Sequence, residues 1–439
     1  MNKSNSKYSL SCIFKSSKNK MFGVYETHEV KGVGGNGVFR GSVSSIRSMG
    51  KVLFFDVRHG KAKMQVYFQS IKNDKLSFAV KKLNVGDFVN VHGIYFWTET
   101  KERTLRLLKL EFIFKKIKNS GGGGGTGTDY QYHKKLNLKS NVLRFLRTFL
   151  YKNNFIEVET PVFQKNPGGA LAKPFKTNSG FSFFYLRISL EIYLKKLMVS
   201  GCSRVFELGR VFRNEGGSMI HSNEFTMVEA YASFSKYGFM VKLVYALIQE
   251  LHYKTYGCKY IINFNNIIFL NKVWRVLDYQ ETIRLFTRNK LWFNMSRLGK
   301  ENYCLSIKKP LGFNLLKIKN IDNFVFDKLV STKLLQPTFV TKFPRILCPL
   351  AKLNNLNSKF VDIFELYISG KELAPGYSEQ TDPFIQSKLL VKQNKFKRSL
   401  YDKKFIDNLT RGVPYMSGIG LGVNRLIMIL SNSKNIRDF

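Results

Sequence analysis

Short runs in which apolar and polar residues alternate follow one another in the first quarter of the chain, at residues 38–43, 52–57, 63–68, 88–95 and 104–113. An alternation with a period of two is typical of strands that bury one face. Glycines lie between or within these runs, at Gly41, Gly50, Gly60, Gly86 and Gly93. We therefore expect a small β-barrel over residues 38–118, of a type that grips single-stranded nucleic acid with aromatic faces and basic rims.

A second alternating pattern runs through residues 205–212, stops at a glycine-rich segment and resumes at Phe225. This pattern predicts a hairpin with a long polar tip. Its first strand ends in Phe212-Arg213-Asn214-Glu215, and its second opens at Glu224-Phe225. An arginine can hold a phosphate through two hydrogen bonds, and a phenylalanine can offer its face to a base. The hairpin is therefore a candidate nucleotide site, although Arg-x-Glu on a strand also occurs as a surface ion pair.

Three further segments carry a recognisable pattern. Apolar residues at helical spacing predict a helix over residues 141–151, and a strand stopped by Pro161 follows it. Alternation over residues 364–369 predicts a strand with Glu365 on the face opposite Phe364. Residues 418–430 read as a glycine-rich strand entering a helix. Between them, residues 236–345 mix helix-like segments with Lys- and Asn-rich loops and show no chemical motif.

Two segments have the composition of linkers rather than of folded elements. Residues 1–37 are rich in Lys, Ser and Asn, and we expect a flexible basic arm that contacts RNA. A transit peptide is the alternative, but no arginine precedes Arg40. Residues 119–140 include five consecutive glycines, and we expect a flexible linker that separates the barrel from a larger domain over residues 141–439.

The charge of the chain points to a polyanionic partner. Its 439 residues contain 71 Lys and Arg against 30 Asp and Glu, a net charge of +41. Nucleic acid is the first candidate, although a coding bias toward Lys, Asn, Phe, Ile and Tyr also contributes. The five cysteines are dispersed without zinc-ligand spacing, which suits a reducing compartment. No apolar run approaches the ~18 residues of a membrane span, so we expect a cytoplasmic protein without membrane attachment.

The residues from Arg204 to Tyr231 resemble the second signature motif of class II aminoacyl-tRNA synthetases, and their surroundings are similar to the lysyl-tRNA synthetases. Residues 141–161 resemble the first motif, which builds the dimer interface, and residues 418–430 resemble the third. The resemblance runs from about residue 38 to the end. It implies an α+β protein with an N-terminal OB-fold barrel and a class II catalytic domain, whose antiparallel sheet is flanked by helices and interrupted by an inserted subdomain at about residues 240–330. It also implies a homodimer.

The resemblance assigns an ATP site, in which Arg213 contacts the α-phosphate, Glu215 the adenine side and Arg425 the γ-phosphate. These three residues are the implied catalytic residues. The implied ATP-binding set is Arg213, Glu215, His221, Phe225, Glu365, Glu372 and Arg425. Glu365 and Glu372 are also the implied Mg²⁺ ligands, and hard oxygen donors suit this ion.

For the amino acid, the resemblance assigns a lysine pocket formed by Gly169, Glu191, Tyr231, Tyr377 and Glu379. Gly169 and Glu191 are expected at the α-ammonium and Glu379 at the ε-ammonium, where a carboxylate is the natural partner. The alternative for Glu191 is a carboxylate that interacts with a helix dipole.

In the barrel, the resemblance implies an anticodon-binding surface. The residues assigned to it are Arg47, Phe54 and Gln65, with Phe54 stacking on a base and Gln65 reading a base edge. For Phe54 the alternative is a position in the barrel core.

Four positions depart from the family pattern, at Ser42, Ile220, Pro375 and Asn424. The expected activity is ATP-dependent activation of lysine to lysyl-adenylate, followed by transfer to the 3′ end of tRNA(Lys). The departures motivate one alternative, a non-catalytic tRNA-binding relative. A relative that lysylates a protein is the other alternative, and the predicted barrel argues against it.

Overall fold

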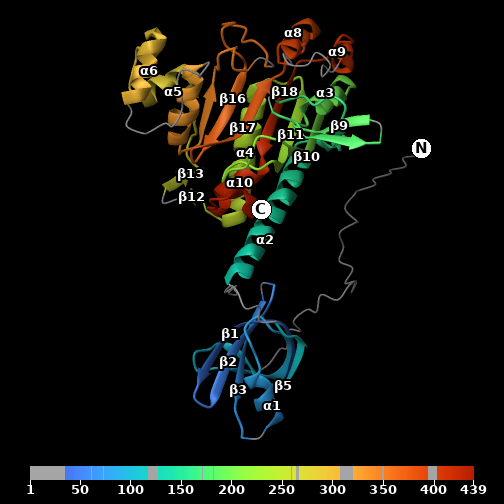
Figure 1. The fold of residues 1–439 in the computed structure, drawn as a ribbon, viewed down its shortest axis with the longest axis vertical. Coiled ribbons are helices and arrows are strands. Elements are labelled where there is room, and N and C mark those ends of the chain that lie inside the picture. Colours follow the sequence, from blue (N-terminus) through green and yellow to red (C-terminus); the bar gives the residue numbers. More distant parts are fainter. Residues whose placement is uncertain are drawn as a thin grey trace, which may run out of the picture. The chain divides into compact units, whose positions relative to one another are not determined.

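The computed structural model describes residues 35–60, 62–72, 74–116, 127–170, 172–180, 182–258, 260–263, 266–306, 320–348, 351–393 and 403–439. The chain forms two compact units, Met1–His133 and Lys134–Phe439 (Figure 1). The basic arm expected at residues 1–37 lies outside the described residues except for its last three. The run of glycines in the expected linker also lies outside the described residues.

The first unit is a closed barrel in which the strands follow the order β1-β2-β3-β5-β4. Its elements are β1 (Asn36–Met49), β2 (Val52–His59), β3 (Ala62–Gln69), α1 (Lys75–Lys81), β4 (Phe88–Trp97) and β5 (Arg103–Phe114). The alternating runs of the sequence supply these strands, and their inward side chains, such as Val57, Val66 and Val91, are fully buried. The predicted OB-fold barrel is therefore confirmed.

Two glycines allow the barrel strands to pack closely. A Cβ at Gly41 would collide with the carbonyl of Arg58, and a Cβ at Gly93 with the carbonyl of Arg106. Gly93 lies where the β4–β5 register shifts. Because any larger side chain would collide with backbone at these points, the strands can bend and close only with glycine there.

The second unit is built on an eight-stranded sheet with the order β14-β15-β16-β17-β18-β11-β10-β6. The six central strands pair antiparallel, and the two outer strands, β14 and β6, pair parallel to their neighbours. The strands are β6 (Ile156–Glu157), β10 (Arg204–Phe212), β11 (Glu224–Ser233), β14 (Arg275–Asp278), β15 (Thr338–Thr341), β16 (Ile363–Ile368), β17 (Lys371–Ser378) and β18 (Met416–Gly422). The predicted antiparallel catalytic sheet with flanking helices is confirmed.

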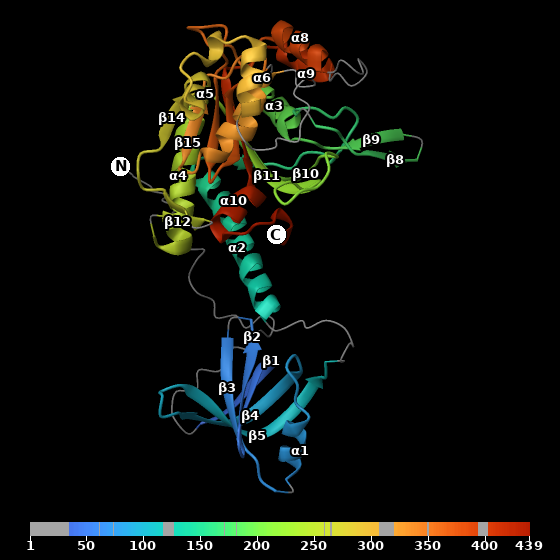
Figure 2. The same ribbon diagram turned by 60° about the vertical axis from the view of Figure 1, so that its left-hand side comes forward.

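Alternation along the central strands gives this sheet two different faces. On β11, Val228 and Ala230 face a large apolar core, whereas Glu229 and Tyr231 point to the opposite side. The apolar face is covered by α2 (Gly127–Lys152), α4 (Tyr237–Tyr256) and α10 (Val423–Ser431) (Figure 2). The other face is covered only in part, so that its centre is free to hold polar groups.

The remaining strands and helices lie outside the eight-stranded sheet. A three-stranded sheet consists of β7 (Phe163–Gln164), β8 (Lys176–Ser179) and β9 (Ser182–Leu186), and it precedes α3 (Glu191–Val199). A hairpin of β12 (Tyr260–Asn263) and β13 (Asn266–Phe269) follows α4. The other helices are α5 (Tyr279–Thr287), α6 (Arg297–Ser306), α7 (Ile321–Val325), α8 (Pro383–Gln393) and α9 (Lys403–Leu409). Within the described residues, no helix is long and apolar enough to cross a membrane.

Two expected boundaries differ from the structure. Helix α2 begins at Gly127, so the second half of the segment expected as a linker at 119–140 is helical. The cause is that good helix formers resume soon after the glycines, and the apolar residues of the same helix pack on the sheet. Helix α4 belongs to the main core and β14 to the main sheet, so the insertion expected at about 240–330 contains elements of the central architecture.

Candidate functional site

The hairpin predicted from residues 204–231 is present, with β10 ending at Phe212 and β11 opening at Glu224. Its tip closes on itself, since the backbone N–H of Arg213 donates to the carbonyl of Asn223 at 2.8 Å and that of Ser218 to the carbonyl of His221 at 2.9 Å. The expected surface ion pair also exists, but it joins Arg210 to Glu224. Arg213 and Glu215 are thus left to face the pocket beside the tip.

This pocket has a volume of about 480 Å³. It is lined from the hairpin, β17, β18, α10 and the C-terminal segment, by Arg213, Glu215, Gly216, Gly217, Ser218, Ile220, His221, Ser222, Phe225, Met227, Glu372, Leu373, Pro375, Gly420, Gly422, Asn424, Arg425 and Ile436. Six of the seven residues predicted for ATP therefore meet around one cavity. The seventh, Glu365, lies on the neighbouring strand β16, opposite Pro375 of β17.

The two arginines of the pocket are held by neighbouring groups. The Arg213 guanidinium lies 5.2 Å from the centre of the Phe225 ring, and its Nε donates to the carbonyl of Ile188 at 3.2 Å. The Arg425 Nη1 donates to the carbonyl of Glu372 at 2.9 Å, and its Nη2 lies 3.3 Å from His221 Nε2. Burial, and then the charge of Arg425, lower the pKa of His221, so this imidazole is a neutral group beside the guanidinium.

Three acids gather at the edge of the same pocket. Glu365 accepts a hydrogen bond of 2.6 Å from the Tyr367 hydroxyl. Burial and the nearby Glu372 raise the pKa of Glu365 well above its ordinary value, and the same two causes raise the pKa of Asp327 to about 6. A bound cation would relieve the electrostatic repulsion among Glu365, Glu372 and Asp327. No three His, Cys, Asp or Glu side chains of the described residues form a metal site by themselves. Two carboxylates together with phosphate oxygens nevertheless fit Mg²⁺.

A cluster of acids, called the acidic pocket below, lies beside this pocket on the same face of the sheet. Its carboxylates are Glu191 at the start of α3, Glu229 on β11 and Glu379 directly after β17. Glu229 accepts hydrogen bonds from the Ser189 hydroxyl at 2.9 Å, from the Leu190 N–H at 3.1 Å and from the Tyr231 hydroxyl at 3.2 Å. The expected lysine residues are therefore brought together, and Glu229, which the sequence analysis did not single out, joins them.

Burial controls the charge of this acidic pocket. It raises the pKa of Glu229 to about 7, with Glu191 as the second cause. It also raises the pKa of Glu379 to about 7, where Lys195 acts in the opposite direction. The pKa values of Tyr231 and Tyr377 are raised well above the ordinary value, again chiefly by burial. The pocket is therefore negative at and above neutral pH, and it suits a cationic ligand.

Glycines let the backbone approach these acids closely. Gly169 has φ +86°, and a Cβ there would lie 2.9 Å from Glu191 Cβ and from Ser189 Oγ. A Cβ at Gly418 would lie 2.5 Å from Glu379 Oε1 and would collide with the Tyr231 ring. Since both collisions are with the acidic pocket, the two glycines let backbone line its walls.

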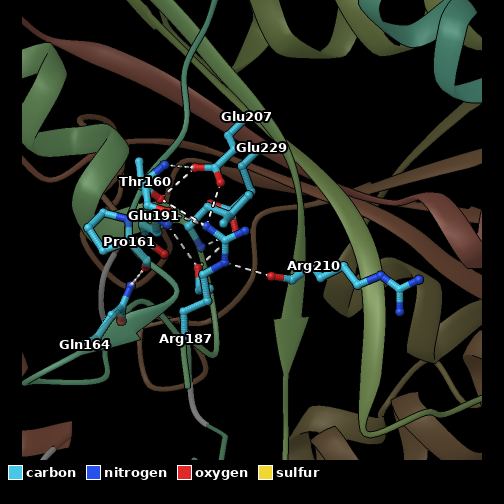
Figure 3. Close-up of polar contacts among 10 residues, drawn as sticks. Thr160, Pro161, Gln164, Arg187, Glu191, Glu207, Arg210 and Glu229 are labelled. Carbon is cyan, nitrogen blue, oxygen red and sulfur yellow. Dashed lines mark hydrogen bonds and ion pairs between the residues drawn. The ribbon is translucent and has the colours of Figure 1, made fainter. Parts of the chain in front are cut away.

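A buried ion pair fixes the strands beneath the two pockets (Figure 3). Arg187 Nη1 lies 2.6 Å from Glu207 Oε1, and both side chains are 5% exposed. The same guanidinium donates to the carbonyl of Thr160 at 2.9 Å and to that of Arg210 at 2.7 Å. The segment before Pro161 is thereby tied to β10, the strand that leads to Arg213.

The barrel residues predicted for the anticodon lie in different surroundings. Arg47 is exposed and 3.9 Å from Asp56, whereas the Phe54 ring is half-buried against Tyr67, with 5.4 Å between the ring centres. Gln65 is buried. Its side-chain amide accepts a hydrogen bond from the Thr104 hydroxyl at 2.7 Å and donates one to the Glu102 carboxylate at 3.2 Å. Both ends of this amide are thus engaged inside the barrel in this structure.

One cation beside the 480 Å³ pocket was absent from the sequence analysis. The C-terminal segment packs on the hairpin tip, where the Ile436 N–H donates to the carbonyl of Met219 at 2.8 Å. This places the Arg437 guanidinium against Gly217, where a Cβ would collide with it. Nothing in the local sequence indicated this contact, because it joins segments more than two hundred residues apart.

The family comparisons agree with this geometry. The profile described as "tRNA synthetases class II (D, K and N)" matches residues 127–439, and the one described as "OB-fold nucleic acid binding domain" matches residues 38–118. A curated "Lysine--tRNA ligase" from Buchnera aphidicola subsp. Schizaphis graminum is 37% identical over 89% of this chain and 83% of the relative.

Proteins with the same name from two other bacteria are also similar to this chain. The one from Wigglesworthia glossinidia brevipalpis is 34% identical over 91% of this chain and 86% of the relative. The one from Halalkalibacterium halodurans is 32% identical over 94% of this chain and 86% of the relative. Because both the profile match and these similarities span most of the chain, it belongs to the class II tRNA synthetases of the D, K and N type.

Proposed function

We propose that this chain is a lysine–tRNA ligase, which activates lysine with ATP and transfers it to tRNA(Lys). The observation that carries the proposal is the acidic pocket of Glu191, Glu229 and Glu379, which adjoins the nucleotide pocket of Arg213 and Arg425. A chain with 30 acidic residues places three of them side by side here, with Glu229 and Glu379 buried and Glu191 half-buried. The names of the relatives support the same assignment.

In the first step, the lysine carboxylate attacks the α-phosphorus of ATP and pyrophosphate leaves. Negative charge grows on the phosphate oxygens, and a fixed guanidinium stabilises it there. Arg213 fits this role because the carbonyl of Ile188 and the Phe225 ring orient its side chain. Phe225 offers a face to adenine, and Glu215 lines the same cavity at the adenine side.

Arg425 and His221 fit the outer phosphates. The neutral imidazole accepts from the Arg425 guanidinium through Nε2 and helps to orient it, while Arg425 supplies the charge for the phosphates. Glu365 and Glu372 would hold Mg²⁺, which neutralises the phosphates when it is bound. Glu372 also fixes Arg425 through its carbonyl, so one residue serves both cations.

The pocket walls account for the choice of lysine. Glu191 and Gly169 are assigned to the α-ammonium, and Glu379 to the ε-ammonium beside Tyr231 and Tyr377. The Glu229 carboxylate fixes Ser189, the Leu190 N–H and the Tyr231 hydroxyl, and thereby shapes the wall between them. A neutral side chain would bring no second ammonium group to Glu379 and would lose that charge-assisted hydrogen bond.

Transfer to tRNA requires the barrel. Its half-buried aromatic rings, Phe54 on β2, Tyr67 on β3 and Phe96 on β4, follow one another with ring centres 5.4 and 5.7 Å apart. Arg106 lies 5.5 Å from the centre of the Phe96 ring, so cations border the rings. Stacking faces with basic neighbours suit single-stranded anticodon bases. Arg47 and Phe54 are assigned to this contact, and Gln65 joins it if it exchanges its bonds to Thr104 and Glu102.

A homodimer completes the proposal. Large apolar side chains are exposed along the first-motif segment and the small sheet beside it, at Ile156, Val162, Phe163 and Phe183. A second copy of the chain is the occupant that the family resemblance implies for this surface. Sedimentation of the purified protein tests it. The cytoplasmic location stays a prediction.

The test of the function is ATP–pyrophosphate exchange with each amino acid in turn, without tRNA. Lysine-dependent exchange is the expected result. Exchange with another amino acid would mean that the roles given to Glu191, Tyr231 and Glu379 are wrong. Absence of exchange with every amino acid would favour the non-catalytic tRNA-binding relative, which Ile220, Pro375 and Asn424 motivate.

A further inference from the structure

The acidic pocket contains a lysine of the protein itself. Lys195 lies on α3, one turn after Glu191, and its side chain is 2% exposed. Its Nζ is 2.6 Å from Glu191 Oε1 and 2.5 Å from Glu379 Oε2. One buried ammonium thus bridges the two carboxylates that the proposed function assigns to the two ends of substrate lysine.

This ammonium is fixed by its helix. Leu194 and Met198, its neighbours on α3, are fully buried against β10 and β11. Helix α9 packs on α3 through Phe405 and other apolar residues that also contact Ile192. Since both sides of the helix are covered, Lys195 cannot turn into solvent without unpacking α3, and it stays in the pocket when a ligand enters.

The contacts of Lys195 do not use every oxygen of the two acids. They use one oxygen of each carboxylate, Oε1 of Glu191 and Oε2 of Glu379. The other oxygen of Glu379 faces Gly418, beside the Tyr231 ring. Each acid therefore keeps an oxygen for a second ammonium group while it is bound to the first.

The charges of the pocket require a resident cation. Glu191 and Lys195 face it from α3, Glu229 and Tyr231 from β11, and Tyr377 and Glu379 from β17 and the segment after it. Substrate lysine brings two ammonium groups, and its carboxylate reacts with the α-phosphorus of ATP. When Glu229 is ionised, the three carboxylates carry one negative charge more than the two ammonium groups of the substrate neutralise, and Lys195 balances it.

We propose that Lys195 is a positioning residue for lysine activation, whose fixed ammonium keeps Glu191 and Glu379 ionised and close together so that each can receive one ammonium group of the substrate. This inference rests on the proposed function. Burial alone would lower the pKa of Lys195, but Glu191 and Glu379 raise it above its ordinary value, so the ammonium is permanent.

The consequence is a defined pH dependence. Lys195 lowers the pKa of Glu379, which burial holds at about 7 even so. Removal of the ammonium raises this pKa further, and the acid is then protonated at neutral pH. Lysine binding needs the ionised acid, so the acidic limb of the pH profile moves to higher pH.

The experiment is lysine-dependent ATP–pyrophosphate exchange by Lys195→Met, measured from mildly acidic to mildly alkaline pH. Lys196→Met, on the same helix but half-buried, is the matched control. We expect a rise of about tenfold or more in the KM for lysine at neutral pH, which corresponds to a shift of about one pH unit in the acidic limb. The KM for ATP and the control variant should be unchanged, and Lys195→Arg should restore most of the lysine affinity.

Several outcomes would overturn the inference. A lower KM for lysine would make Lys195 a competitor of the substrate, and an unmoved pH profile would make its role purely structural. Lys195→Gln, which can hydrogen-bond both acids without charge, replaces the Met variant if that one does not fold, and the same shift is expected. If the unaltered protein shows no lysine-dependent exchange, the proposed function fails. If it does and both uncharged variants behave like it, only the role of Lys195 fails.

Discussion

The buried pair of Arg187 and Glu207 gives the sharpest prediction about stability. Arg187→Met removes the cation but keeps most of the volume, and it leaves a carboxylate that is 5% exposed without its charge partner. It also deletes the hydrogen bonds to the carbonyls of Thr160 and Arg210. These hydrogen bonds join the segment before Pro161 to β10. Their loss therefore lowers the free energy of unfolding of the whole catalytic unit.

The magnitude follows from what remains at Glu207. Removal of one member of a buried pair destabilises a protein by about 3–5 kcal/mol. Glu207 keeps two hydrogen bonds, from the backbone N–H of Thr160 at 3.1 Å and from its hydroxyl at 2.6 Å. These bonds still satisfy one carboxylate oxygen, so we expect a loss near the lower end, about 3 kcal/mol. Arg187→Met with Glu207→Leu should cost less than the two single changes added, since no buried charge is left.

The assay is denaturant unfolding followed by tryptophan fluorescence. Trp274 and Trp292 are buried in the catalytic unit and report its unfolding, whereas the half-exposed Trp97 belongs to the barrel. The control is Arg147→Met, which breaks the pair with Glu157 at 2.8 Å, where the arginine is 44% exposed. A loss of about 0–1 kcal/mol is expected there. If Arg187→Met costs no more than Arg147→Met, the reasoning about burial is refuted.

Three further changes separate the pockets from one another. Arg213→Ala should lower the rate of adenylate formation by about 10²–10³-fold while tRNA affinity, measured by filter binding, stays within about twofold; an equal loss of both would contradict the role at the α-phosphate. Gly418→Ala puts a methyl group beside Glu379 and Tyr231, so the KM for lysine should rise by about tenfold or more at an unchanged KM for ATP. Arg437→Ala should raise the KM for ATP about three- to tenfold without affecting that for lysine, and an unchanged ATP dependence would place this guanidinium outside the phosphate site.

The sequence predicted most of the strands, because the period-two pattern depends on which face of a strand is buried. It also predicted the hairpin tip, because the glycines at 216 and 217 interrupt that pattern. It could not reveal Glu229 as a pocket residue: on β11 this acid alternates with Val228 and Ala230 like any outward polar residue. Its burial arises only because α3 packs over that face and because Ser189 and Tyr231 donate to it.

Gln65 and the start of α4 lie in surroundings that the sequence did not indicate. The resemblance assigned Gln65 to a base edge; in the structure, cross-strand hydrogen bonds to Thr104 and Glu102 engage its amide in the barrel, and contact with a base stays a prediction. The resemblance also implied an insertion from about residue 240, whereas α4 covers the central sheet. In both cases long-range pairing, which no local pattern contains, decides the environment of the residue.

The departure at Asn424 has a different meaning in the structure from the one its position suggests. The resemblance places an aspartate at this position, and an amide there suggests a looser orientation of the Arg425 guanidinium. The Asn424 side chain is instead buried and accepts a hydrogen bond of 3.0 Å from the N–H of Thr226, which ties α10 to β11. An amide oxygen accepts that bond as a carboxylate would, and it does so without a buried charge. Arg425 is oriented by Glu372 and His221, so this substitution leaves the arginine of the nucleotide pocket in place.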